Sequence, residues 1–266
     1  MNAEGPTEHG EADRLHEGLR LSFTDLFRRI EGAWLEERAG YRLVVCPSLP
    51  FPGFNGLWID DGPDEATAAG EIEAAIAEVE SREMPCWIEL RAGRTPTVEQ
   101  VARRLGFTDE EAVPGMVARR DELVVGPRPD VQVTRVRDRD RLDIAAALAA
   151  AGFEAPPNAL APLYTDTVAA MPGLSIYLAE ADGLPVSTAA AWMGDGGIGI
   201  FSVATPPEYR GRGYGRAVTA RAVEDGFVSG ADLAWLQASQ LGENIYRAMG
   251  FRHVETYLVL GRPANE

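Results

Sequence analysis

A glycine-rich run between a strand-like and a helix-like segment constrains the fold of this chain more than any other feature. The apolar segment IGIFSVAT (198–205) is typical of a strand, and the loop PPEYRGRGYG (206–215) follows it directly. The next residues place Ala217, Ala220 and Val223 at helical spacing. Glycine is costly to order, so a glycine cluster before a helix indicates that something approaches the backbone closely. The pattern predicts a strand–loop–helix unit built around that loop.

The chemistry of the loop suits an anion. Backbone N–H groups at a helix N-terminus, together with the helix dipole, favour negative charge. Gly213 and Gly215 allow an anion to reach the main chain, and Arg210 and Arg212 add fork-shaped donors. The phosphate motifs GK[ST] and G-x-G-x-x-G are both unmatched. From these residues alone, a pyrophosphate site and a basic surface turn both remain open.

The residues before and after the loop predict a mixed α/β domain. Strand-like runs at 174–180, 185–193 and 198–205 are separated by turns at Asp182-Gly183 and Gly194–Gly197, as in a β-meander. The other elements expected here are strands at 131–136, 232–238 and 252–260, and helices at 138–151, around 160–170, at 214–228 and at 240–249.

The first half of the chain is also predicted to contain both helices and strands, as the second half is. We expect a disordered acidic tail over residues 1–18 and a domain over 19–126, with a boundary where Gly126, Pro127 and Pro129 interrupt two strand-like runs. The elements expected in this half are helices at 21–39, 64–81 and 96–105, and strands at 41–46, 56–60, 86–91 and 115–121.

The two halves resemble one another. GRTPTVEQVARRLGF (93–107) and QASQLGENIYRAMGF (237–251) each form a predicted helix that ends in Gly-Phe, follows a Trp-containing strand and precedes another strand. A glycine after a helix followed by an aromatic residue is common, but the matched order of four features indicates a tandem repeat.

Composition excludes several classes of protein. The net charge of −16 argues against nucleic acid as a partner. No stretch has the ~18 consecutive apolar residues of a membrane helix, and the first twenty residues lack the apolar core of a signal peptide. Only Cys46 and Cys86 occur, with three histidines, so neither a disulfide framework nor a usual zinc site is expected. We expect a soluble, cytoplasmic protein without a metal.

Two motifs resemble those of the GNAT superfamily, the GCN5-related N-acetyltransferases. Arg210-x-x-Gly213-x-Gly215 after a strand is similar to the family signature R/Q-x-x-G-x-G/A, and NIYRAMGF is similar to its Tyr-x-x-x-Gly-Phe segment. The resemblance covers residues 130–262. It implies an α+β fold of two GNAT-like domains, each a mostly antiparallel sheet flanked by helices, of which the domain at 19–126 is degenerate.

The resemblance also implies roles for individual residues. The backbone amides of residues 211–215 would hold the pyrophosphate of acetyl-CoA, and the strand residues before the loop would pair with pantetheine. Tyr246 would protonate the departing thiolate. In the helix at 240–249, the core stripe is expected to be Leu241, Ile245, Ala248 and Met249, with Tyr246 near its edge, and from that position alone a packing tyrosine is favoured. The cofactor-binding residues implied are Val203, Thr205, Arg210, Gly211, Arg212, Gly213, Tyr214 and Gly215.

The sequence departs from the family pattern at three places. The strand before the loop has no carboxylate to act as a general base, and Glu180, Asp195 and Glu208 are expected at strand ends or turns. In the first half, Ala102 stands where the second half has Tyr246, and the segment DGPDEATAAG (61–70) is acidic and lacks arginine. We therefore expect this half to bind no coenzyme and to shape the acceptor cleft.

These observations predict an acetyl-CoA-dependent N-acetyltransferase that acts on the amine of a small molecule or peptide in a ternary complex. The alternatives are a catalytically inactive acyl-CoA-binding module and a structural repeat protein. The acidic surface could favour cationic amines, although solvation also explains it. Neither nucleic acid nor membrane is expected as a partner, and the chain is expected to be a monomer or a homodimer.

Overall fold

The computed structural model describes residues 8–124, 126 and 130–263, and the chain separates into two compact units that are each discontinuous in sequence. Unit 1 comprises the described residues up to Ser22 and Gly115–Val254; unit 2 comprises Phe23–Pro114 and the described residues from Glu255. The expected boundary at 126 therefore differs from the observed division, which falls within a strand. Pro127 and Pro129 lie outside the described residues.

Unit 1 contains a mostly antiparallel sheet in the order β5-β10-β9-β8-β7-β6. The expected β-meander is confirmed as three consecutive antiparallel strands, and β9 and β10 form a parallel pair. The strands are β5 (Asp109–Arg119), β6 (Gln132–Arg135), β7 (Leu174–Ala181), β8 (Leu184–Gly194), β9 (Gly197–Ala204) and β10 (Leu233–Gln237).

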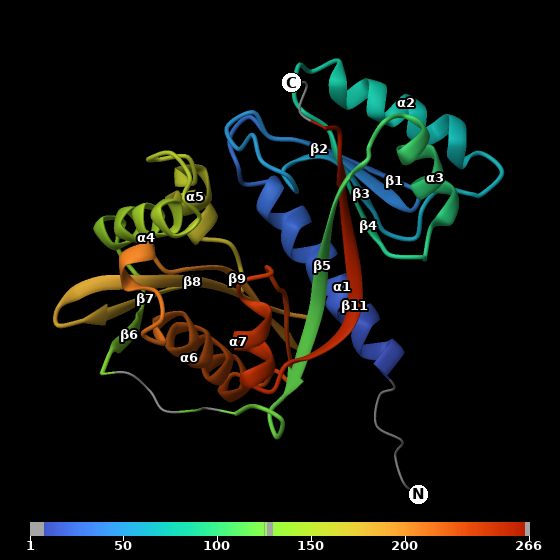
Figure 1. Cartoon of the computed structure of the whole chain (residues 1–266). Coiled ribbons are helices and arrows are strands. Elements are labelled where there is room, and N and C mark those ends of the chain that lie inside the picture. The colour runs from blue at the N-terminus through green and yellow to red at the C-terminus, as the bar shows by residue number, and fades with distance from the viewer. Residues whose placement is uncertain (1–7, 125, 127–129, 264–266) are drawn as a thin grey trace, which may run out of the picture. The chain divides into compact units, whose positions relative to one another are not determined.

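Helices cover both faces of this sheet. The elements α4 (Arg139–Gly152), η1 (Ala161–Tyr164) and α5 (Asp166–Ala169) lie over one face, and α6 (Tyr214–Val228) and α7 (Glu243–Ala248) lie over the other (Figure 1). The predicted α6 stripe is buried, with Ala217, Val223 and Phe227 at most 6% exposed. Close packing of α6 on β9 requires a glycine, because a Cβ at Gly226 would lie 2.7 Å from the Ile198 side chain.

Unit 2 has a similar plan. Its sheet runs β1-β2-β3-β4-β11, and β3 and β4 are parallel while the neighbouring pairs are antiparallel. The helix α2 (Ala68–Glu80) connects the two parallel strands, as α6 does in unit 1. The remaining elements are β1 (Trp34–Arg38), β2 (Tyr41–Val45), β3 (Asn55–Ile59), β4 (Trp87–Arg91), α3 (Pro96–Arg104) and β11 (Arg252–Gly261).

The expected disordered tail is wrong for the residues that the structure describes. The helix α1 (Glu8–Phe27) begins ten residues before the tail was expected to end. Leu15 and Leu19 are at most 1% exposed, and the buried Glu11 forms ion pairs with Arg119 and Arg252. These partners lie more than a hundred residues away in the sequence, so local composition carries no sign of them.

The expected helix at 21–39 is also wrong in its second half. It ends at Phe27, and residues Trp34–Arg38 form the edge strand β1, paired with β2. Tertiary pairing overrides the helical propensity of a segment as short as WLEER. Within the described part of the chain, no helix combines the length and apolar character that crossing a membrane requires.

Candidate functional site

The loop before α6 presents a row of unused backbone donors. Gly211 and Gly213 have φ of +77° and +81°, in the left-handed region where only glycine is unstrained. Ala217 is the first residue of the helix whose N–H bonds back into the loop, to the carbonyl of Gly213 at 3.0 Å. The N–H groups of residues 211–216 donate no hydrogen bond to any described residue. Alternating backbone conformations with free N–H groups form an anion-binding concavity.

The arginines of the loop have different environments. The Arg210 guanidinium donates to the carbonyls of Thr205 and Gly152, at 3.1 and 2.7 Å, and pairs with Glu154. It therefore fixes the loop against the end of α4, which differs from the direct anion contact that we expected. The Arg212 side chain is exposed and has no hydrogen bond or ion pair with any described residue, so it is available to a ligand.

Glycine also allows α6 to begin close to the end of β9. A Cβ at Gly215 would lie 3.3 Å from Thr205 Oγ1 and 3.8 Å from Val203 Cγ1. The half-buried Tyr214, at the first position of α6, packs against the core of unit 1. The structure thus brings all eight predicted cofactor-binding residues to one end of β9, with Val203 and Thr205 on the strand side of the loop.

The strand β9 separates from its parallel neighbour just before the loop. The register between β10 and β9 ends at Leu236↔Ile200, so the described ladder with β10 does not include Ser202–Ala204. At the same place Ser202 has φ of +48°, and the register with β8 shifts between Thr188 and Ala190, which marks a β-bulge. An unpaired strand edge offers main-chain donors and acceptors to an extended ligand. No local pattern in the sequence indicates this bulge.

Tyr246 lies on the α6 side of the separated strands. Its side chain is 9% exposed and packs edge-on to Phe251. A Cβ at Gly242 would lie 2.9 Å from Cε2 of the Tyr246 ring, so glycine at this position makes room for the ring. Burial raises the pKa of Tyr246 to about 12, and the nearby Thr219 hydroxyl opposes part of that rise. The Thr219 hydroxyl is itself buried and has no hydrogen-bond partner of ordinary length among the described residues. Two polar groups therefore meet here inside an apolar core.

The face of α7 that is buried differs from the one expected. Leu241 and Ile245, predicted to be core residues, are 80% and 44% exposed, and Ala248 is also exposed. Met249 is buried as expected, and Tyr246 is buried as well. The helix spans only six residues, so fewer than two turns determine which of its side chains are buried. The tyrosine is thus at the centre of the buried face, where it was expected at the edge.

The carboxylates nearest to β9 in the sequence lie near a strand end or in turns. Glu180 pairs with Arg141 at 2.6 Å, Asp195 lies in the β8–β9 turn with φ of +48°, and Glu208 lies in the short helix η2 (Pro207–Tyr209). Their expected positions at strand ends and turns agree with the structure. In the described residues, no group of three or more His, Cys, Asp or Glu side chains is placed to hold a metal ion.

The opposite side of the bulge carries a group that the sequence did not reveal. Tyr164 of η1 is 2% exposed, and its hydroxyl lies near Ser202 without a hydrogen bond of ordinary length to any described residue. Burial raises the pKa of Tyr164, so the hydroxyl stays protonated. A strained residue beside an unsatisfied hydroxyl is typical of a functional site rather than of a core.

Comparison with known proteins finds a family model that matches part of this unit. Residues 172–253 match the acetyltransferase (GNAT) domain model. A GCN5-related N-acetyltransferase from Kribbella flavida is 21% identical with a TM-score of 0.68, covering 92% of this chain and 95% of that one. One from Sphaerobacter thermophilus is 16% identical with a TM-score of 0.60, covering 99% and 96%.

A tandem GNAT protein from the clavulanic acid biosynthesis pathway also shares the fold. It is 12% identical with a TM-score of 0.62, covering 92% of this chain and 89% of that one. No curated protein matches the sequence. The structural likenesses show that the chain has the α+β fold of GNAT proteins, with a large, mostly antiparallel sheet flanked by helices.

Proposed function

We propose that the chain transfers an acetyl group from acetyl-CoA to an amine by direct attack in a ternary complex, since residues 172–253 match the acetyltransferase (GNAT) domain model. One observation carries the proposal: free N–H groups of residues 211–216 lie at the end of β9, next to the stretch that β10 leaves unpaired. An anion site followed by an open strand edge matches a ligand with a pyrophosphate and an extended, amide-containing arm.

The loop would bind the pyrophosphate through its backbone. The amides of residues 211–215 would donate to phosphate oxygens, and the unpaired Arg212 would add a charged contact. Val203 would pair through its backbone with the amides of the pantetheine arm. The carbonyl oxygen of Thr205 already accepts a hydrogen bond from Arg210. Thr205 would therefore line the site next to the pantetheine arm, and its carbonyl oxygen would contribute less to binding the arm.

Tyr246 would assist the leaving group. The acceptor nitrogen forms a bond to the acetyl carbon as the C–S bond breaks; the nitrogen loses a proton, and the thiolate gains one. Because burial raises the pKa of Tyr246 to about 12, full proton transfer from it to a thiolate of ordinary pKa, ~8.5, is uphill. Its hydroxyl would therefore act mainly by donating a hydrogen bond to sulfur as charge develops there.

Unit 2 is proposed to be a degenerate GNAT-like domain without a coenzyme. Two N–H groups of the segment between β3 and α2 already donate hydrogen bonds within unit 2. Ala66 N–H donates to the Asp64 carboxylate at 2.9 Å, and Gly62 N–H donates to the carbonyl of Gly40. Asp60 pairs with the buried Arg42. Carboxylates at this position repel an anion, and Ala102, which is fully buried, provides no acid.

A second candidate function is an acyl-CoA-binding module without catalysis. The strand β9 itself contains no carboxylate, so it provides no side-chain base for the acceptor amine. Tyr246 argues for catalysis, because a pure binding protein has little use for a buried hydroxyl at that position.

A thiol-release assay separates the two candidates. Amines, aminoglycosides and peptides are incubated with acetyl-CoA and the protein, and free CoA is followed with a thiol-reactive chromophore. The transferase proposal predicts release that requires both the acceptor and the protein, with acetylated acceptor seen by mass spectrometry. Binding of acetyl-CoA without release above hydrolysis for any acceptor would favour the binding module.

A further inference from the structure

A buried hydroxyl without a partner lies beside the β9 bulge, on the face of the sheet that α4 covers. Tyr164 of η1 is 2% exposed, and its hydroxyl forms no hydrogen bond of ordinary length with any described residue. The backbone here is held in place, because the Tyr164 carbonyl accepts a hydrogen bond from Arg139 of α4 at 3.0 Å. The hydroxyl faces the side chain of Ser202. A buried donor without an acceptor lowers stability, so packing alone does not account for it.

The bulge turns Ser202 toward this hydroxyl. Between two pairs of the β8–β9 ladder, Ser202 and Val203 oppose the single residue Ala189. Val203 faces α6, since a Cβ at Gly215 of that helix would lie 3.8 Å from its Cγ1. Ser202 instead lies near Tyr164, on the opposite face. Bulges are over-represented next to active sites, where they change the direction of a side chain.

Both residues destabilise the fold where they stand, and each has a simpler replacement. Ser202 has φ of +48°, which glycine adopts without strain and serine does not. Phenylalanine in place of Tyr164 would fill the same space without a buried hydroxyl that lacks a partner. Strained residues and unsatisfied polar groups gather at functional sites, and these two lie at one bulge. The pair therefore points to a ligand that satisfies it.

The pair lies on the side of the sheet that remains for the acceptor. Tyr246, proposed to assist the leaving group, belongs to the part of the chain next to α6, over the opposite face (Figure 1). Ser202 is half-buried and begins the stretch that the ladder with β10 does not include, so a ligand along that stretch lies beside it. A hydroxyl oxygen accepts two hydrogen bonds. Ser202 can thus accept from Tyr164 and from the ligand at the same time.

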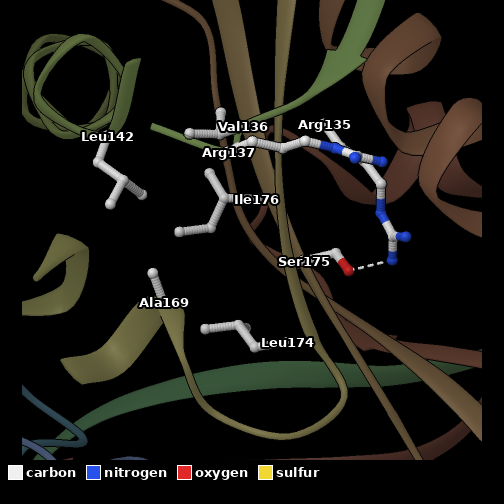
Figure 2. Close-up of a pocket in the computed structure, with 8 residues that line it drawn as sticks. All are labelled: Arg135, Val136, Arg137, Leu142, Ala169, Leu174, Ser175 and Ile176. Atoms are coloured by element: carbon white, nitrogen blue, oxygen red, sulfur yellow. Dashed lines mark hydrogen bonds between the residues drawn. The ribbon is translucent and has the colours of Figure 1, made fainter. Parts of the chain in front are cut away.

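A cavity on the same face is apolar inside. It has a volume of about 260 Å³ and lies between α4, α5 and the adjacent ends of β6 and β7 (Figure 2). The polar side chains that border it, Arg135, Arg137 and Ser175, project to the other side. Its interior is lined by apolar side chains, among them Leu142, Ala169, Leu174 and Ile176.

Strand register aligns this cavity with the bulge. Ile176 of β7 is opposite Ala190 of β8, and Ala190 is opposite Phe201 of β9, the residue before Ser202. Directly opposed residues share a face of the sheet, and with strands ~4.8 Å apart Ile176 lies about 10 Å from Phe201. Ala190, between them, is small and half-buried. An amine at Ser202 therefore has room for an apolar body on this face.

We propose that Ser202, positioned by Tyr164, binds the nitrogen of the acceptor, and that the acceptor is a primary amine with an apolar body. This rests on the proposed function. The Tyr164 hydroxyl donates to Ser202 Oγ, which accepts a second hydrogen bond from an N–H of the amine. Such bonds are often long in the free enzyme and tighten in the complex. The nitrogen bonds to the acetyl carbon, the C–S electron pair leaves with sulfur, and water takes the second N–H proton while the first stays on Ser202.

Octylamine is the probe for the full chain, and 2-(2-ethoxyethoxy)ethylamine is its polar counterpart of equal length. We expect kcat/KM to be about tenfold higher for octylamine, because ether oxygens lose their hydration in an apolar cavity. Ser202→Ala should lower kcat/KM for octylamine about tenfold, as for loss of one hydrogen bond, and leave the Kd for acetyl-CoA unchanged. Ser175→Ala is the matched control, since this half-buried serine projects to the other side of β7, and it should leave kcat/KM unchanged.

Two further variants separate the hydroxyl pair from the fold. Tyr164→Phe should lower kcat/KM for octylamine about fivefold without lowering the midpoint of thermal unfolding, because the hydroxyl that it removes has no partner. Ser202→Gly relieves the backbone strain and should still lose as much activity as Ser202→Ala. Because Tyr164 acts through Ser202, the double variant Tyr164→Phe/Ser202→Ala should be no slower than Ser202→Ala.

The inference is overturned if Ser202→Ala behaves as Ser175→Ala does, if the effects of Tyr164→Phe and Ser202→Ala simply add, or if the ether amine is preferred. Failure of the proposed function gives a different result. Acetylation of peptides or amino sugars without acetylation of octylamine would overturn this inference alone. No thiol release with any amine, despite bound acetyl-CoA, would overturn both.

Discussion

Replacement of Gly213 by valine is expected to weaken acetyl-CoA binding by about 100-fold. Gly213 has φ of +81°, which a β-branched residue adopts only with severe strain, so the loop must change conformation. Each charge-assisted hydrogen bond contributes at least ~1.5 kcal/mol, so loss of two from residues 211–215, ~3 kcal/mol, corresponds to roughly two powers of ten in Kd. Isothermal titration calorimetry with acetyl-CoA measures the change.

Gly230 provides the matched control. It also has a positive φ, +105°, lies just beyond the other end of α6, and has open space where a Cβ would project. Gly230→Val should lower the midpoint of thermal unfolding through the same backbone strain and keep the affinity for acetyl-CoA within about twofold. Equal loss of affinity in both variants would mean that strain in unit 1, rather than the loop geometry, accounts for the effect.

Replacement of Tyr246 by phenylalanine is expected to lower kcat by about 100-fold while the Kd for acetyl-CoA is unchanged. Positioned proton donors typically contribute 10²–10⁴-fold, and the lower value suits a hydroxyl that acts by hydrogen bonding. Phenylalanine retains the packing against Phe251. Single-turnover rates of thiol release measure the chemical step separately from binding.

Tyr177 is the control for that variant. Its hydroxyl donates to Asp225 at 3.1 Å, and burial also raises its pKa to about 12, but it lies on β7 away from the open stretch. Tyr177→Phe should leave kcat unchanged. The pH profile gives a further check: a donor must stay protonated, and a pKa near 12 keeps Tyr246 protonated through pH 10. A limb near pH 8–9 that disappears only in Tyr246→Phe would contradict this assignment.

The local features of unit 1 could be predicted from the sequence because they depend on residues that are neighbours in the chain. The turns at Asp182-Gly183 and Gly194–Gly197 mark the meander, and the loop glycines mark the start of α6; the structure has each of these at or within one residue of its expected place. Turn chemistry and helix starts depend on neighbouring residues, so a single sequence carries them.

Features that depend on distant contacts were missed. The buried Glu11 is compensated by Arg119 and Arg252, so the acidic composition that suggested a disordered tail instead belongs to a packed helix. The β-bulge at Ser202 arises from pairing with β8 and separation from β10, which no local pattern encodes.

Calorimetric titration of the unmodified chain with acetyl-CoA tests the central claim most directly, because the claim assigns a single coenzyme site to the loop at residues 211–215. We predict one molecule bound per chain. Two molecules per chain would contradict the claim by showing that unit 2 also binds the coenzyme. Absence of binding would contradict it as well, because acetyl transfer would then have no donor on this chain.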